Sequence, residues 1–130
     1  MEFKQQHAIY LQIADHLCEQ VLRKTLLAGA KIPSIRDLAT LVEVNPNTVV
    51  RTYSYLEEQN IIYKERGLGY FVAKDGYANA LALKKELFLR EHLPEVFKNL
   101  ALLNMNFSDL QDFYKKYCIN LKQEESHEKQ

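Results

Sequence analysis

Apolar side chains near the amino end of the chain recur every fourth position, which is the spacing of one face of a helix. The stripe consists of Ile9, Ile13, Leu17 and Val21. An amphipathic helix buries such a stripe against a neighbouring element and leaves its opposite face in water. The pattern predicts a first helix from about Ala8 to about Leu26.

A break and a second helix follow. Gly29 suits a turn, and Pro33 forces the residue before it toward an extended conformation. Ser34 and Asp37 then have the spacing of a capping box, in which two side chains bond backbone amides at the start of a helix. The apolar residues after them predict a short second helix that ends near Val42.

The third helix is predicted to begin at Asn45, in a polar turn whose residues favour the start of a helix. Asn45 can accept a hydrogen bond from a free amide of the first turn. Pro46 at the first helical position loses no bond, because its amide would be unpaired there anyway. The local sequence therefore specifies where this helix starts.

The two faces of the third helix carry different chemistry. Its inward stripe consists of Val49, Thr52, Tyr53 and Leu56. This stripe leaves Asn47, Thr48 and Arg51 pointing outward from the first turns. Two short helices joined by a tight turn, with small polar groups at the amino end of the second, have the geometry of a helix-turn-helix that enters the major groove of DNA.

A β-hairpin is predicted directly after the third helix. Residues 61–64 and 70–73 are rich in β-branched and aromatic side chains, and they flank a tip that contains glycine. In this tip Arg66 lies beside Gly67, which places a cation on a backbone that can approach a phosphate or a minor groove closely. A hairpin in this position is the wing of a winged helix-turn-helix.

The remainder of the chain has a helical pattern of its own. It predicts one helix to about His92, a second element that starts at Pro94, and a third that is introduced by a capping box of Ser108 and Gln111. Three helices in about 45 residues cannot bury this much apolar surface alone. We therefore expect them to pack against the same segment of a second chain in a two-fold dimer.

These patterns predict a mainly α fold with a small β-hairpin, namely a winged helix-turn-helix followed by a short helical dimerisation segment. The DNA-binding domain is expected at residues 1–75 and the dimerisation segment at 76–122. Residues 123–130 are charged and lack apolar anchors, which predicts a disordered tail. At 130 residues the chain has no room for a large catalytic domain beside a separate binding domain.

Overall charge neither supports nor excludes a nucleic-acid partner, because 17 Lys and Arg balance 17 Asp and Glu. What matters is where the cations lie, since salt limits the reach of each charge to about 10 Å. No apolar run approaches the roughly 20 residues that cross a membrane. The first ten residues also lack the pattern of a secretory signal, so we expect a cytoplasmic protein.

Catalytic and metal-binding patterns do not stand out in the sequence. It has no nucleophile elbow, no phosphate loop and no spacing of metal ligands, so we expect neither an enzyme nor a cofactor. Cys18 and Cys118 lie far apart and are interpreted as buried thiols, with an interchain or redox role as the alternative.

The segment from Pro33 to Ala73 resembles the winged-helix domain of the GntR family of bacterial transcription regulators. It reads PSIRDLATLVEVNPNTVVRTYSYLEEQNIIYKERGLGYFVA, with the proline-serine helix start, the NPNTV run and the arginine-glycine wing in the order and spacing of that family. The preceding IYLQIADHLCEQVL matches the helix before it. The short remainder resembles the YtrA-type subgroup, whose members carry a small helical dimerisation segment in place of a large effector-binding domain.

The resemblance implies a sequence-specific transcription regulator, expected to be a repressor, that binds a palindromic operator in double-stranded DNA as a homodimer. It gives no indication of a small-molecule effector. It implies DNA contacts from Ser34, Arg36, Asn45, Asn47, Thr48, Arg51, Arg66 and Gly67. Ser34 and Asn45 have helix capping as their alternative role, and Arg36 and Arg51 have that of solvated surface cations. Glu43 lies where many relatives have glycine, so a left-handed backbone is expected there at a cost of about 1 kcal/mol.

Two other interpretations of the sequence compete with a sequence-specific regulator. One is a winged helix that binds a partner protein, and the neutral charge balance is its best argument. The other is an architectural protein that binds DNA of any sequence. The salt dependence of DNA binding separates the first of these from a DNA binder, because neutralising phosphates makes affinity fall steeply with salt.

Overall fold

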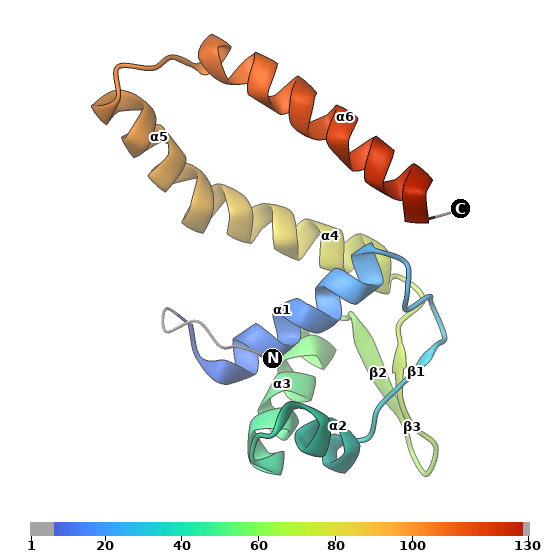
Figure 1. Cartoon of the computed structure of the whole chain (residues 1–130). Coiled ribbons are helices and arrows are strands. Elements are labelled where there is room, and N and C mark those ends of the chain that lie inside the picture. The colour runs from blue at the N-terminus through green and yellow to red at the C-terminus, as the bar shows by residue number, and fades with distance from the viewer. Residues whose placement is uncertain (1–6, 129–130) are drawn as a thin grey trace. The chain divides into compact units, whose positions relative to one another are not determined.

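Helices dominate the structure, a computed structural model that describes residues 7–128 and includes one small antiparallel sheet (Figure 1). The described residues form two compact units, residues 7–86 and 87–128. Residues 1–6 of the predicted DNA-binding domain and residues 129–130 of the predicted tail lie outside the described part. The elements up to the unit boundary are α1 (Ile9–Leu22), β1 (Lys31–Ile32), α2 (Ile35–Val42), α3 (Pro46–Glu58), β2 (Ile62–Glu65), β3 (Gly69–Val72) and α4 (Gly76–Leu87).

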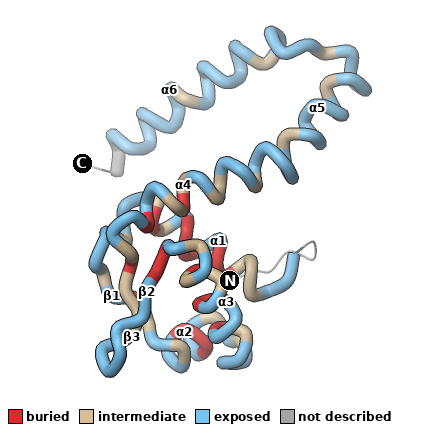
Figure 2. The backbone as a smooth tube through the Cα atoms, turned by 180° about the vertical axis from the view of Figure 1, so that it is seen from behind, coloured by how far each residue is buried: buried red, intermediate tan, exposed pale blue. Residues whose placement is uncertain are grey.

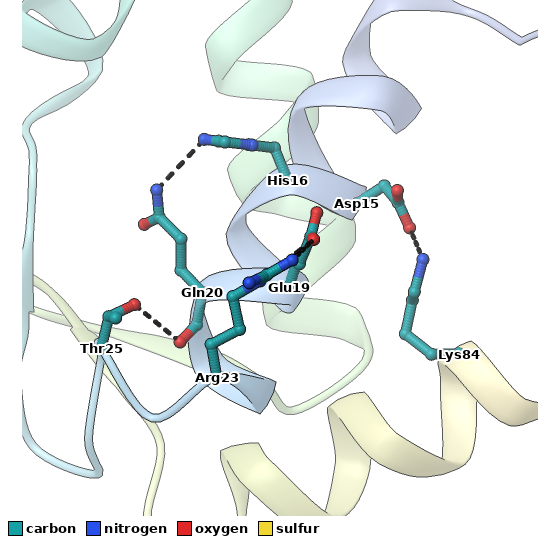
Figure 3. Close-up of polar contacts among 7 residues, drawn as sticks. All are labelled: Asp15, His16, Glu19, Gln20, Arg23, Thr25 and Lys84. Carbon is teal, nitrogen blue, oxygen red and sulfur yellow. Dashed lines mark hydrogen bonds and ion pairs between the residues drawn. The ribbon is translucent and has the colours of Figure 1, made fainter. Parts of the chain in front are cut away.

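The first helix ends earlier than predicted. α1 stops at Leu22 because Lys24 adopts a positive φ of 63°, a conformation that terminates helices. The Gln20 carbonyl at the helix end then accepts from the Thr25 hydroxyl at 2.9 Å (Figure 3) and from the Thr25 amide at 3.0 Å. The predicted extension to Leu26 is therefore wrong, and these residues form a turn.

The helix-turn-helix forms as predicted. The backbone amide of Asp37 donates to the Ser34 hydroxyl oxygen at 3.1 Å, so Ser34 caps α2, and this is the half of the predicted capping box that forms. Glu43 ends α2 with φ 58° and ψ 51°, which confirms the left-handed turn. Asn45 caps α3 by accepting from the amide of Asn47 at 2.8 Å, with Pro46 at the first helical position.

The sheet has one more strand than the sequence predicted. β2 and β3 form the expected hairpin, shifted by one residue, with Ile62 opposite Val72. β1 pairs with the free edge of β3, so that the strand order is β1-β3-β2 and every pair is antiparallel. The pairing continues into the preceding turn, where the amide of Gly29 donates to the carbonyl of Val72 at 2.8 Å. The hairpin is thus anchored to the segment between α1 and α2.

The core of the first unit lies where α1, α3 and the sheet meet (Figure 2). The predicted inner stripe of α3 is fully buried, since Val49, Thr52, Tyr53 and Leu56 all have 0% exposure. α4 joins this unit through buried Ala80 and an ion pair between Lys84 and Asp15 of α1 (Figure 3). The winged helix-turn-helix therefore has a core of its own.

The predicted helix end near His92 and the new element at Pro94 agree with the structure, where a π-helical turn, Phe88–His92, leads into α5 (Leu93–Leu102). Pro94 lies in the first turn of α5, where it loses no hydrogen bond. The second unit differs from the prediction at two points. The capping box consists of Asn106 and Asp109 rather than of Ser108 and Gln111, and it starts a short 3-10 helix, Phe107–Leu110. α6 (Gln111–Glu128) includes residues 123–128, where a disordered tail was predicted.

Apolar side chains of the second unit are largely exposed. α5 has no buried residue, and residues 111–126 of α6 are exposed or half-buried (Figure 2). The large apolar residues with more than half of their surface exposed include Leu102, Leu103, Phe107, Phe113, Tyr114, Tyr117 and Ile119. Monomeric proteins rarely leave so many large apolar side chains exposed to water.

Candidate nucleic-acid interface

The outer face of α3 is polar with one apolar position. Its exposed residues include Asn47, Val50, Arg51 and Ser54. The last three follow Asn47 by three, four and seven positions, which places all four on one face of the helix. Asn47 and Arg51 point outward as predicted. Thr48 is half-buried, and its carbonyl accepts a hydrogen bond of 3.0 Å from the Thr52 hydroxyl. Val50 and Ser54 were not among the predicted site residues, although their helical spacing from Asn47 puts them on the same face.

The two capping side chains keep groups free for a ligand. The Ser34 oxygen is used as an acceptor, which leaves its hydroxyl proton without a partner within the described chain. Asn45 accepts through Oδ1, which likewise leaves its amide NH₂ group without one there. Both residues are exposed. Capping and contact with a ligand are therefore compatible, and neither role excludes the other.

Three arginines carry a charge that no acid of the described chain neutralises. Arg36 lies in the first turn of α2, Arg51 on α3 and Arg66 at the hairpin tip, and all three are exposed with no ion pair among residues 7–128. α2, the start of α3 and the hairpin tip lie at the same end of the first unit (Figures 1 and 2). By contrast, Arg23 on α1 is paired with Glu19 at 2.8 Å (Figure 3). A chain of zero net charge thus presents unpaired cations at one end.

The hairpin tip is a tight turn in which two glycines adopt positive φ angles. Gly67 and Gly69 adopt positive φ values of 81° and 112°, and the amide of Leu68 donates to the carbonyl of Glu65 at 2.9 Å to close the turn. Arg66 and Gly67 are exposed at this tip. The tip therefore projects a cation from a narrow turn.

α3 is held against its neighbours by buried side chains. The Tyr53 hydroxyl donates to the carbonyl of Pro33 at 2.6 Å, which ties α3 to the start of α2. The Tyr53 and Tyr70 rings meet edge to face with centroids 4.7 Å apart, which ties α3 to β3. Burial raises the pKa of Tyr53 above its usual range, and the neighbouring Tyr70 adds to this effect. The neutral phenol therefore sets the spacing of the two helices.

The amino end of α1 borders the same face. A groove of about 290 Å³ lies between the first turn of α1 and the first turns of α3. The guanidinium carbon of Arg51 lies 4.0 Å from the centroid of the Tyr10 ring. The residues that line the groove are Ala8, Ile9, Tyr10, Asn47, Thr48 and Arg51. Tyr10 was not among the predicted site residues, and no local spacing places it beside Arg51.

Neither a metal-ligand cluster nor a membrane-spanning helix occurs among the residues that the structure describes. Between residues 7 and 128 no three His, Cys, Asp or Glu side chains come close enough to hold a metal ion. Over the same residues no helix has the length and hydrophobicity needed to cross a membrane.

Comparison with known proteins points to one family. Residues 9–72 match the model of a family described as bacterial regulatory proteins, gntR family. The HTH-type transcriptional regulator YhcF of Bacillus subtilis is 38% identical over 109 residues, which cover 84% of this chain and 88% of YhcF. The HTH-type transcriptional repressor YtrA of the same organism is 30% identical over 114 residues, which cover 88% of this chain and 87% of YtrA.

Solved structures agree with the sequence relatives. A GntR family transcriptional regulator from Listeria monocytogenes superposes with a TM-score of 0.72 at 32% identity, covering 88% of this chain and 98% of that protein. YtrA from Sulfolobus acidocaldarius, a GntR-family transcription factor, superposes with a TM-score of 0.54 at 33% identity, covering 68% of this chain and 93% of that protein. The similarity to the Listeria protein extends beyond the winged helix into the carboxy-terminal helices.

Proposed function

The chain belongs to the gntR family of bacterial regulatory proteins and is a DNA-binding transcription regulator, and from this premise we propose that it is a dimeric repressor that reads a palindromic operator. The repressor assignment draws on the YtrA relative from Bacillus subtilis, which is named a transcriptional repressor and aligns over 88% of this chain.

The observation that carries the proposed DNA interface is the set of three unpaired arginines at one end of the first unit. Arg36, Arg51 and Arg66 are exposed and have no acidic partner within residues 7–128. Unpaired cations attract phosphates, whereas a cation already held by a carboxylate has lost most of that attraction. We assign phosphate or base contacts to these three and to the polar groups beside them, namely Ser34, Asn45, Asn47, Thr48 and Gly67.

In this arrangement α3 lies in the major groove and the hairpin acts as a wing. Asn47 and Arg51 face outward from α3, and such side chains can make paired hydrogen bonds to adenine and guanine. We propose that Ser34 and Arg36 at the start of α2, and Arg66 and Gly67 at the hairpin tip, contact the sugar-phosphate backbone of the DNA. Backbone contacts orient the protein, and the contacts of α3 supply discrimination between sequences.

The exposed apolar face of α5 and α6 supports a homodimer through the second unit. We assign the DNA-binding role to residues 1–75 and the dimerisation role to residues 76–122. Within the second segment α4 packs in the first unit, so the exposed apolar side chains come mainly from α5 and α6, and α6 continues to Glu128. A second copy of the same face would cover the apolar residues, and a two-fold dimer would present two recognition helices. Such a pair reads half-sites about 34 Å apart, one turn of DNA.

Selection of bound sequences from a random duplex pool at near-physiological salt tests the proposed function. We expect a palindrome with half-sites about one turn of DNA apart. If the folded protein enriches no sequence and its weak DNA binding falls with salt, it is an architectural DNA binder instead. If it has little affinity for DNA at any salt, the winged helix serves a protein partner.

The arginine set has a matched internal control. With the selected duplex, Arg36→Ala, Arg51→Ala and Arg66→Ala should each weaken binding, by roughly 5- to 100-fold where the arginine pairs with guanine. An arginine that contacts phosphate should also lower the salt slope by about one unit. Arg23→Ala removes the same charge from α1, where Glu19 pairs it, and should bind normally. Equal effects of all four variants would mean that overall charge, and not these positions, governs binding.

The dimer interface is tested by placing a charge on the apolar face. Phe113→Glu changes a side chain that is 66% exposed, so it should not disturb folding of the monomer. We expect sedimentation to show a monomer and operator affinity to fall, because the two half-sites then bind separately. Asn99→Glu adds the same charge at an exposed polar position of α5 and is the control. A Phe113→Glu variant that stays dimeric would place the interface elsewhere.

A further inference from the structure

Arg51 has an unusual environment for an exposed cation. Its guanidinium carbon lies 4.0 Å from the centroid of the Tyr10 ring, well inside the distance of about 6 Å at which a cation and an aromatic face attract. It makes no ion pair or hydrogen bond within the described chain. The side chain is therefore held by a ring rather than by an acid, which leaves its charge uncompensated.

Tyr10 is itself fixed by α3. The Tyr10 and Tyr55 rings meet edge to face, with centroids 6.3 Å apart and planes at 80°. Tyr55 and Arg51 lie one helical turn apart, so the Tyr10 ring contacts both from the same side. The backbone of Tyr10 also contacts α3, because its carbonyl lies 3.0 Å from the hydroxyl of buried Thr52 and shares that single donor with the carbonyl of Thr48. Ring and backbone of Tyr10 thus take their position from α3.

The contact with the Tyr10 ring occupies none of the hydrogen-bond donors of Arg51. A guanidinium is planar, and its five N–H donors point outward in that plane, whereas the aromatic ring attracts its flat face. The same arginine can therefore stay on Tyr10 and still donate to a phosphate or a guanine. Arg51 shares the groove with Asn47 and Thr48, so these donors lie beside the other polar groups of the face.

Holding the side chain in advance also reduces the cost of binding. A free arginine side chain loses about 2 kcal/mol of rotamer entropy when it is immobilised. A side chain that is already restricted on a ring loses less, and the difference appears as affinity. From these contacts we infer that Tyr10 is a positioning residue of the DNA interface, which holds the Arg51 guanidinium at the groove between α1 and α3 for contact with DNA. This inference rests on the proposed function.

Substitutions at Tyr10 separate positioning from direct contact. Tyr10→Phe keeps the aromatic face and removes the hydroxyl, so operator affinity should stay within about twofold of the original. Tyr10→Leu keeps apolar bulk and removes the ring, and it should weaken operator binding by roughly two- to fivefold, the range expected for an exposed cation–aromatic pair. If Tyr10→Phe is as weak as Tyr10→Leu, the hydroxyl touches DNA directly and the inference is wrong.

A double-mutant cycle with Arg51 measures whether the effects of the two substitutions on operator affinity are coupled. A purely structural role of Tyr10 would give no such coupling. In the Arg51→Ala background, Tyr10→Leu should cost almost nothing, because the ring then has no cation to hold. Additive losses in the double variant would show that Tyr10 affects DNA binding independently of Arg51, and would overturn the inference. Thermal melting of each variant separates a loss of folded protein from a loss of affinity.

The control for the inference is the same cycle at a paired position. Arg23→Ala combined with Tyr10→Leu should show no coupling, since Arg23 lies at the other end of α1 beside Glu19. Failure of the proposed function looks different from failure of the inference. If the original protein selects no sequence, the proposed function fails, whereas an operator that Arg51→Ala weakens and Tyr10→Leu does not would contradict the inference alone.

Discussion

Tyr53 provides a sharp test of how the two helices of the helix-turn-helix are held together. Its side chain is fully buried, and its hydroxyl donates to the carbonyl of Pro33 at 2.6 Å. Tyr53→Phe keeps the ring and its edge-to-face contact with Tyr70 at 4.7 Å, and removes only the hydroxyl. The substitution therefore isolates one hydrogen bond between α3 and the start of α2.

The expected loss in free energy of unfolding depends on whether the Pro33 carbonyl finds another hydrogen-bond donor. A typical net hydrogen bond contributes about 0.5–1.5 kcal/mol, and a buried acceptor left without a partner costs about 1–3 kcal/mol. Pro33 is half-buried, so water can replace part of the bond. We expect Tyr53→Phe to lower the free energy of unfolding by about 1–2 kcal/mol, which corresponds to a fall in Tm of roughly 4–16 °C for a domain of this size.

The pH dependence of the same variant adds a second test. Burial raises the pKa of the Tyr53 phenol, so the folded state keeps a proton that the unfolded state loses near pH 10. The stability contributed by the neutral phenol is complete below about pH 10 and is lost as the pH rises above it. The gap in stability between the original protein and Tyr53→Phe should therefore shrink above pH 10.

Thermal or urea unfolding followed by circular dichroism at pH 7.5 and at pH 10.5 measures both effects. Tyr63→Phe is the control, because Tyr63 is 40% exposed and its hydroxyl has no hydrogen-bond partner within residues 7–128. A Tyr53→Phe protein that melts with the original at neutral pH would refute the role of the hydroxyl. A gap that does not change with pH would refute the linkage to its ionisation.

Three further predictions concern the backbone and the buried thiol. Glu43→Gly should raise the free energy of unfolding by up to about 1 kcal/mol in urea titrations, because glycine adopts the left-handed backbone at φ 58° without strain; a less stable variant would contradict this. Gly76→Ala should destabilise by about 1–3 kcal/mol, because a Cβ there would lie 2.7 Å from the carbonyl oxygen of Ile61; unchanged thermal melting would show that α4 shifts freely. Burial raises the pKa of the Cys18 thiol to about 11, so a thiol reagent at pH 8 should label half-exposed Cys118 quickly and Cys18 only on unfolding; the stability due to neutral Cys18 should decline as the pH rises from about 9 to 11, and rapid labelling of both thiols would disprove its burial.

The starts of α2 and α3 and the inward stripe of α3 could be predicted from the sequence, because neighbouring residues determine them. Ser34 and Asn45 cap their helices through hydrogen bonds that reach only three or two residues along the chain. Glu43 adopts the left-handed turn at the position where the family resemblance placed glycine. Each of these features is a contact within one turn of helix, and residue type and spacing suffice to specify it.

Two predictions, the capping box before α6 and the end of α1, were wrong because two local sequence patterns overlap at each place. Ser108 and Gln111 have the spacing of a capping box, but Asn106 and Asp109 have it too and form it. Leu26 continues the apolar pattern of α1, yet Lys24 reverses the backbone before it. Between two overlapping local patterns, the sequence alone does not decide which one the chain adopts.

The arrangement of the interface depends on contacts between distant parts of the chain. β1 exists because Lys31 and Ile32 find the free edge of β3 some 40 residues later, where an extended pair gains partners for its backbone groups. Tyr10 lies against Arg51 because α1 packs on α3, and no repeat along the sequence links these two positions. Residue types and spacing determined the helices, the wing and the family. Tertiary packing decided which cations lack an acidic neighbour and which ring holds Arg51, because such pairs form only when separate elements come together.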